Sequence, residues 1–87
     1  MEVSFSPTFV RMYKTLSKNL QEEVESKIEL FKNLRNHKIL KVHKLSGRLK
    51  GRQSFSVNYK TRVVFMYLPT KSREACLLAV GDHDIYD

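Results

Sequence analysis

The spacing of apolar residues changes once along this 87-residue chain, close to Asn36. Before that point apolar residues recur every three or four positions, which is the spacing of one face of a helix. After it they alternate with polar residues or form short β-branched and aromatic runs, which is typical of strands. The change predicts helices followed by a sheet, within a single domain over residues 1–87.

The first half of the chain is expected to hold a short strand and two helices. Residues 2–6 alternate like a strand, and Ser6-Pro7 is a helix start because Ser caps the N-terminus and Pro lacks the N–H that is unpaired there. Residues 17–19 interrupt the helical pattern. The two apolar stripes on either side are Phe9, Met12, Tyr13 and Leu16, then Leu20, Val24, Ile28, Phe31 and Leu34.

The second half predicts three strands, at residues 54–57, 62–68 and 74–80, with Gly47 and Gly51 in turns before them. The last strand is apolar on both faces, so we expect it inside the sheet. Ser54 and Ser56 alternate with Phe55 and Val57, which predicts a half-buried first strand. The order is β-α-α-β-β-β, an α+β fold in which a helical hairpin packs on a mainly antiparallel, twisted sheet.

The distribution of charge points to a polyanion as partner. The formal net charge is +7, and the 44 residues from Leu30 to Arg73 contain no Asp or Glu. Such an uncompensated field attracts nucleic acid, the commonest polyanion of a cytosol. An anionic membrane surface fits less well, because no helix combines basic residues with bulky apolar anchors. The twelve basic residues of this stretch are Lys32, Arg35, Lys38, Lys41, Lys44, Arg48, Lys50, Arg52, Lys60, Arg62, Lys71 and Arg73.

A cytoplasmic, soluble protein is expected. The single Cys76 cannot form an intramolecular disulfide and lies in an apolar run, where we expect a buried thiol in a reducing compartment. The first ten residues carry an acid and no apolar core, unlike a signal peptide. The longest apolar stretch, residues 63–68, is too short to span a bilayer.

Two residues could supply the cation and the acid that are needed to cut RNA without a metal. That reaction uses the 2′-OH as nucleophile and needs a base, a fixed cation for the phosphorane-like charge, and an acid for the leaving 5′-oxygen. Arg62 opens an otherwise apolar strand, where a guanidinium is rigid and can bind phosphate with two hydrogen bonds. His83 titrates near neutrality, and Asp82 and Asp84 should favour its charged form. The alternatives are a solvent-facing strand-end arginine and a tail histidine without a role.

Phosphate binding is assigned to basic residues around the two turn glycines and beyond: Lys44, Arg48, Lys50, Arg52 and Lys60. Gly47 and Gly51 do not form a phosphate loop, because no Lys-Ser/Thr pair and no helix follow them. No metal or other cofactor is expected. His37, His43 and His83, with the two tail aspartates, match no compact zinc spacing, and their surroundings are positive.

Three segments, in this order, resemble the RelE/ParE superfamily of bacterial toxins. They are HKLSGRLKGRQSFSV at 43–57, YKTRVVFMY at 59–67 and LLAVGDHDIYD at 77–87. The resemblance runs from the first strand to Tyr86. It implies a RelE-like toxin of a type II toxin–antitoxin system, an mRNA endoribonuclease that works in the ribosomal A site beside 16S rRNA and inhibits translation. Its products would be a 2′,3′-cyclic phosphate and a 5′-OH.

The resemblance also implies roles for single residues. Arg62 is similar in position to the catalytic arginine of the family, His83 to the residue that acts on the leaving group, and Tyr86 to a terminal aromatic that stacks on or hydrogen-bonds RNA. Packing of Tyr86 on the sheet is the alternative. Ser56 stands where the best-known branch has a lysine base. A second branch has a glutamate where this chain has His43, so a neutral His43 is our hypothesis for the base.

Two other functions remain open at this point. A ParE-like toxin has the same fold but inhibits DNA gyrase without nuclease activity, and Ser56 keeps that alternative in view. A plain RNA-binding module, or an inactive relic of a nuclease, is the other. Either toxin would be neutralised by an acidic antitoxin that wraps the basic domain.

Overall fold

The computed structural model describes residues 1–70, 73–82 and 85. It confirms the predicted order of helices and strands and adds a two-residue strand and two short 3₁₀ helices. The elements are β1 (Glu2–Phe5), α1 (Pro7–Lys14), α2 (Lys18–Phe31), η1 (Leu34–Asn36), β2 (His43–Lys44), η2 (Gly47–Leu49), β3 (Gln53–Ser56), β4 (Arg62–Tyr67) and β5 (Glu74–Gly81).

Serine side chains start both α-helices. The Ser6 hydroxyl accepts the N–H of Phe9, and the Ser17 hydroxyl accepts the N–H of Leu20. The break predicted at residues 17–19 is therefore only the cap of α2, which begins at Lys18. The prediction that Leu34 continues the apolar stripe is wrong, because α2 ends at Phe31 and Leu34 is 47% exposed in η1.

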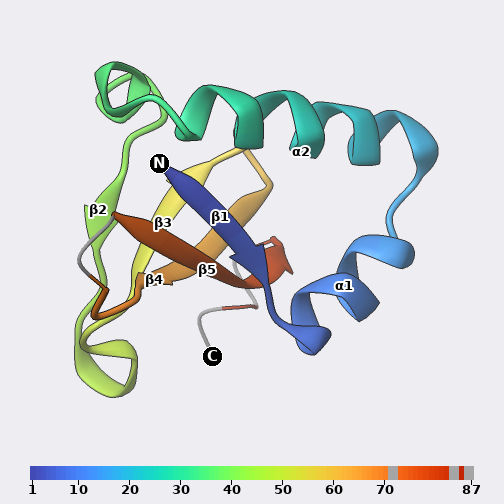
Figure 1. Ribbon diagram of the computed structural model, residues 1–87. Helices are drawn as coiled ribbons and strands as arrows, with labels where there is room; N and C mark the ends of the chain where they lie inside the picture. Colours follow the sequence, from blue (N-terminus) through green and yellow to red (C-terminus); the bar gives the residue numbers. More distant parts are fainter. Residues whose placement is uncertain (71–72, 83–84, 86–87) are drawn as a thin grey trace.

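The sheet is mixed, with the strand order β1-β5-β4-β3-β2 (Figure 1). β1 pairs with β5 in parallel, and the other three pairs are antiparallel. β5 lies between β1 and β4, which confirms the interior position predicted for a strand that is apolar on both faces. β2 forms the edge opposite β1 and consists only of His43 and Lys44, which pair with Ser54 and Gln53.

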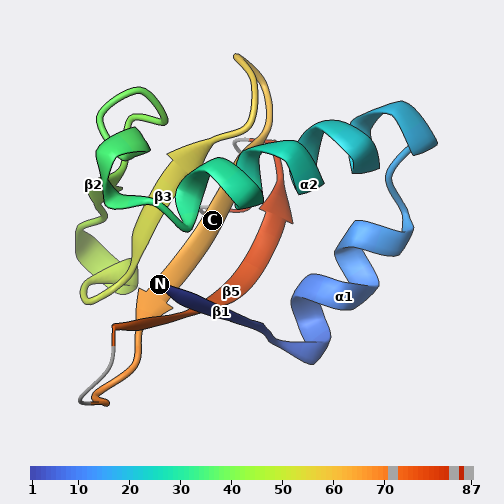
Figure 2. The same cartoon turned by 45° about the horizontal axis from the view of Figure 1, so that its top comes forward.

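Both helices contribute to one core on one face of the sheet (Figure 2). Phe31 of α2 is fully buried at its centre, with ring centroids 4.5 Å from Phe55 and 4.7 Å from Phe65. Phe9 supplies the contribution of α1. The buried residues of this core are Phe9, Val24, Ile28, Phe31, Leu40, Phe55, Val57, Val63, Phe65, Ala75, Leu77 and Val80.

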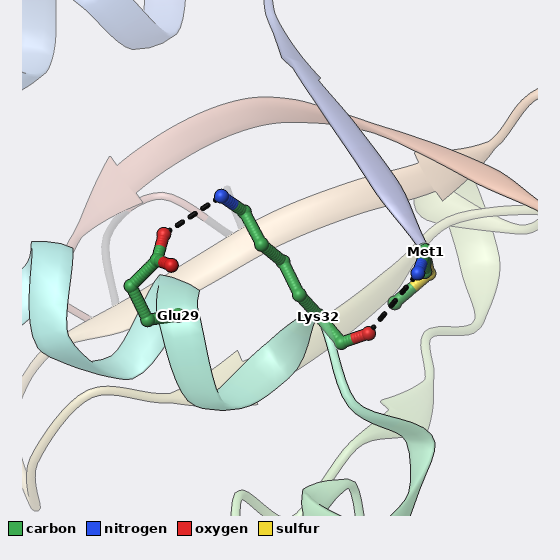
Figure 3. Close-up of polar contacts among 3 residues, drawn as sticks. All are labelled: Met1, Glu29 and Lys32. Carbon is green, nitrogen blue, oxygen red and sulfur yellow. Dashed lines mark hydrogen bonds and ion pairs between the residues drawn. The ribbon is translucent and has the colours of Figure 1, made fainter.

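The start of β1 is joined to the end of α2 (Figure 3). The N-terminal amine of Met1 donates to the carbonyl of Lys32 at 3.3 Å, and Lys32 Nζ lies 2.7 Å from Glu29 Oε2. These groups are exposed, and an exposed ion pair contributes at most about 1 kcal/mol. Of the two contacts, only the hydrogen bond from Met1 reaches the first strand, and the ion pair lies within the end of α2.

Two burial predictions are wrong. Cys76 is partly exposed, and β3 is buried beyond the half-buried strand predicted, because Ser54 on its polar side is fully buried as well. Within the described residues no helix is long and apolar enough to cross a membrane.

Candidate active site

The face of the sheet opposite the helices carries the candidate catalytic residues. Side chains alternate between the two faces of a strand, so the neighbours of the core residues in β3 and β4 lie on the other side. We call this side the helix-free face and define it by Ser54, Ser56, Arg62, Val64 and Met66. Ser54 and Val64 are nonetheless buried, so this face is closed at its centre and more open toward Ser56 and Arg62.

Arg62 is the first residue of β4, as predicted, and is half-buried. Its cross-strand partners are Ser56 on β3 and Gly81 on β5. Nη1 donates to the carbonyl of Asn58 and, at 3.1 Å, to the carbonyl of Thr61. Nε and Nη2 make no hydrogen bond with the described residues. The β3–β4 turn therefore holds the guanidinium through Nη1, and Nε and Nη2 remain as donors for an anion.

His43 lies on the edge strand β2 and is exposed. Its Nδ1 is 2.8 Å from the carbonyl oxygen of Lys41. A carbonyl can only accept, so Nδ1 carries the proton and a neutral ring presents its lone pair at Nε2. Nε2 has no hydrogen-bond partner among the described residues. A general base needs such a free lone pair.

The sheet register places His43 and Arg62 on the same face. His43 pairs with Ser54, and Ser56 on the same strand pairs with Arg62, so the two site residues are two strands apart and offset by two residues. Strand spacing and rise put their Cα atoms roughly 12 Å apart. Two long side chains separated by this distance can reach one ligand lying over Ser56.

His83 and Tyr86 lie outside the described residues, so no geometry is assigned to either. The chain that leads to them is described as far as Asp82, and Gly81 is the register partner of Arg62. Ile85 donates its N–H to the carbonyl of Asp82 at 3.2 Å. A Cβ at Gly81 would lie 2.7 Å from the Cγ2 atom of Ile85, so a larger residue at this end of β5 would require Ile85 to shift.

The predicted phosphate-binding residues do not form one patch. Lys44, Lys50 and Arg52 line an open hollow of about 530 Å³ beside the start of β3, and Arg48 is exposed on η2 in the same loop. Lys60 lies away from them, on the β3–β4 turn beside Arg62. Gly47 and Gly51 have φ of 67° and 90°, so both glycines are needed for this loop.

The hollow and Arg62 are separated along β3. Lys44 pairs with Gln53 at the start of this strand, whereas Arg62 pairs with Ser56 at its end. Because side chains alternate along a strand, Lys44 projects from the side of β2 opposite His43. A polyanion in contact with both the hollow and Arg62 would therefore pass around the β2 edge of the sheet.

The sequence predicts a turn at residues 58–61 but assigns no site role to two residues that shape this site. Asn58 accepts from the N–H groups of Lys60 and Thr61 and holds the turn that binds Arg62. Lys41 has a φ of 57° and supplies the carbonyl that orients His43. An Asn two residues before a polar pair is a turn signal that points to Asn58. No local signal marks Lys41.

Comparisons with known proteins give likeness in structure and none in sequence. No family model and no curated protein matches the chain. The structure of YafQ from E. coli strain BL21(DE3) is similar with a TM-score of 0.78 at 15% identity, over 98% of this chain and 96% of that one. The YoeB/ParE toxin from Agrobacterium tumefaciens is similar with a TM-score of 0.68 at 16% identity, over 95% of this chain and 99% of that one.

A third similar structure is the toxin–antitoxin complex RelBE2 from Mycobacterium tuberculosis, with a TM-score of 0.70 at 18% identity over 94% of this chain and 96% of that one. The chain has the RelE/ParE fold. Both helices contribute to the core on the opposite face, and Arg62 and His43 lie on the helix-free face. A rigid cation and an oriented imidazole on one face are suited to phosphoryl transfer.

Proposed function

We propose that this chain is the toxin of a type II toxin–antitoxin pair and cuts mRNA in the ribosomal A site without a metal. The RelE/ParE fold supports the toxin role, and the similar structures include a toxin–antitoxin complex. The observation that carries the nuclease is Arg62, a half-buried guanidinium held by two carbonyls on the face without helices.

The proposed reaction is an internal transesterification. Nε2 of His43 takes the proton of the 2′-OH, and the freed oxygen attacks the adjacent phosphorus. Arg62 binds the non-bridging oxygens, where negative charge builds up in the transition state. The bond to the 5′-oxygen breaks, and His83 gives that oxygen a proton. The products are a 2′,3′-cyclic phosphate and a 5′-OH, and Tyr86 stacks on or hydrogen-bonds the RNA.

The basic loop around η2 binds the phosphate backbone. The basic side chains of this loop are exposed, and the stretch from residue 30 to 73 contains no acidic residue that could pair with them. RNA can therefore replace their counterions. The four side chains are Lys44, Arg48, Lys50 and Arg52. Lys60 binds phosphate closer to Arg62. The ribosome supplies 16S rRNA as a further polyanion and holds the message in a reactive geometry.

An acidic antitoxin is the protein partner in this proposal. A domain of net charge +7 attracts an acidic chain over long distances, which speeds association. Covering the basic loop or Arg62 would block RNA binding directly.

Translation in a cell-free extract tests this function against gyrase inhibition. We expect truncated messages with 5′-OH ends, and no effect on DNA supercoiling by gyrase. Intact messages together with blocked supercoiling would contradict the nuclease and favour the ParE-like alternative, for which Ser56 is the argument. Intact messages with normal supercoiling and retained RNA affinity would leave a plain RNA-binding module.

A further inference from the structure

The turn between β3 and β4 is organised by one side chain, Asn58. Its Oδ1 accepts the N–H of Lys60 at 2.9 Å and the N–H of Thr61 at 2.8 Å. The backbone N–H of Val57 donates to the carbonyl of Thr61 at 2.9 Å and closes the turn. An Asn side chain that accepts from the N–H groups two and three residues later replaces a backbone acceptor and fixes the conformation of the turn.

The same turn provides both carbonyls that bind Arg62. Nη1 of Arg62 donates to the carbonyl oxygens of Asn58 and Thr61. The turn that the Asn58 side chain holds sets the direction in which these two carbonyl groups point. The rotamer of the guanidinium therefore depends on the amide of Asn58, although that amide does not touch the arginine in any described hydrogen bond.

Asn58 is also tied to α2. Its Nδ2 donates to Oε1 of Glu23 at 2.5 Å, across 35 positions of sequence. The acceptor is charged, and hydrogen bonds to charged groups are stronger than neutral ones. Glu23 lies one residue before the fully buried Val24, so the helix that anchors the tie is itself fixed in the core.

We propose that Asn58 is a positioning residue for Arg62 and that Glu23 fixes Asn58 from α2. This inference rests on the proposed nuclease function for its effect on catalysis. Nη1 is occupied by the turn, and the geometry leaves Nε and Nη2 to the phosphate. Because transition-state binding depends steeply on position, losing this hold lowers the rate of cutting more than the affinity for RNA.

Exchanging donor and acceptor gives the sharpest test. Asn58→Asp keeps Oδ1 for the two turn N–H groups but sets a second carboxylate against Glu23. Glu23→Gln alone keeps an acceptor oxygen for Asn58. In the double variant the new amide of residue 23 donates to the new carboxylate of residue 58, so the bond is restored with its direction reversed and the net charge is unchanged.

Cutting of message in the translation extract should fall about tenfold to a hundredfold in Asn58→Asp. It should change little in Glu23→Gln and recover in the double variant, while the affinity for a 2′-deoxy RNA analogue stays constant throughout. Full activity of Asn58→Asp, or a double variant as slow as Asn58→Asp, would overturn the part of the proposal in which Glu23 fixes Asn58.

An NMR measurement on the free protein tests the hold on Arg62 without any cleavage. Rotation about the Nε–Cζ bond of Arg62 should be slow in the natural chain and in Asn33→Ala, and fast in Asn58→Ala. Asn33 is a matched control, because its Oδ1 caps a turn by accepting the N–H of Arg35 at 3.0 Å, far from the site. Slow rotation in Asn58→Ala would refute the positioning role.

The two readouts separate the two claims. If the natural chain cuts no RNA but Arg62 is released in Asn58→Ala, the proposed function fails while the hold of Asn58 on Arg62 is supported. If the chain cuts RNA and Arg62 keeps its slow rotation in Asn58→Ala, the nuclease stands and this inference fails.

Discussion

His43 owes its orientation to an unusual backbone conformation two residues earlier. Lys41 has a φ of 57°, in the left-handed region that residues other than glycine and asparagine seldom adopt. In this conformation its carbonyl accepts the Nδ1 proton of His43 at 2.8 Å. Such conformations persist where the surrounding structure fixes them, and they are common at functional sites.

Replacing the imidazole separates catalysis from binding. We expect His43→Ala to lose cutting of translated message, because the proposed acceptor of the 2′-OH proton is removed, while its affinity for a 2′-deoxy RNA analogue stays within about twofold. Cleavage assays and a binding titration on one preparation measure both. Cutting at the natural rate would remove His43 from the mechanism.

We expect the stability of the protein to depend on two tyrosines at alkaline pH. Burial raises the pKa of Tyr67, with Arg73 acting in the opposite direction, and burial followed by the hydrogen bond to Glu25 raises the pKa of Tyr13. Both pKa values are therefore above the ordinary value of 10.0 in the folded state. The stability that the two neutral tyrosines contribute is present below pH 10.0 and is lost as the pH rises through their folded-state pKa values.

The free energy of unfolding should therefore fall above about pH 10. The double variant Tyr13→Phe/Tyr67→Phe cannot ionise at these positions and should lose less stability over the same range. Urea unfolding at several pH values measures the two slopes. Identical slopes would show that these tyrosines do not cause the loss.

At the scale of elements, the two serine caps differ in what they hold. The Ser6 hydroxyl accepts from Phe9 at 3.0 Å and donates to the carbonyl of Leu78 at 3.1 Å, so it joins α1 to β5. Ser17 caps α2 in an exposed position, with a 3.3 Å bond to Leu20. We expect Ser6→Ala to destabilise the fold by about 1–2 kcal/mol and Ser17→Ala by about half of that.

Chemical unfolding of the two variants checks this difference, since both remove the same hydroxyl from the same type of cap. An equal loss of stability would mean that the bond to Leu78 contributes nothing.

Local sequence patterns predicted the elements that local interactions determine. The capped helix starts, the apolar run of β5 and Arg62 at the start of β4 all follow from periodicity and capping. β2 could not be predicted in this way, because it is two residues long and exists only through its pairing with β3. The parallel pairing of β1 with β5 is likewise a contact between distant segments.

The same distinction applies to the candidate site. The basic loop and its turn glycines can be recognised in the sequence, because charge and φ preference are local properties. The split between that loop and Lys60 depends on the register of β3. The bond from Asn58 to Glu23 spans 35 positions and has no sequence signal.

For the whole molecule, one aromatic cluster couples the helices to the sheet. The Phe31 ring stacks on His37 at 4.7 Å as well as on Phe55, and meets Phe65 edge-on. Phe31→Ala should therefore cost about 3–5 kcal/mol and lower the stability of helix and strand together. Circular dichroism and tyrosine fluorescence should report one shared unfolding transition. Two separate transitions would contradict a single core.

Charge is distributed unevenly along the chain, with mixed signs in the helices, only basic residues from 30 to 73 and only acidic ones from 74 to 87. Glu22, Glu23, Glu25 and Glu29 all lie on α2, whereas the stretch from residue 30 to 73 carries only basic charges. The helix-free face belongs mostly to that basic stretch. In the proposed function, long-range attraction brings RNA to this face, and Arg62 stabilises the transition state of cleavage.

The rate at which ribosome-bound message is cut by Arg62→Ala tests this account most directly, with Arg11→Ala as a control for loss of one exposed positive charge. We predict that Arg62→Ala cuts at least about a hundredfold more slowly, with unchanged RNA affinity within about threefold, and that Arg11→Ala cuts normally. An Arg62→Ala variant that is folded and cuts as fast as the natural chain would contradict it.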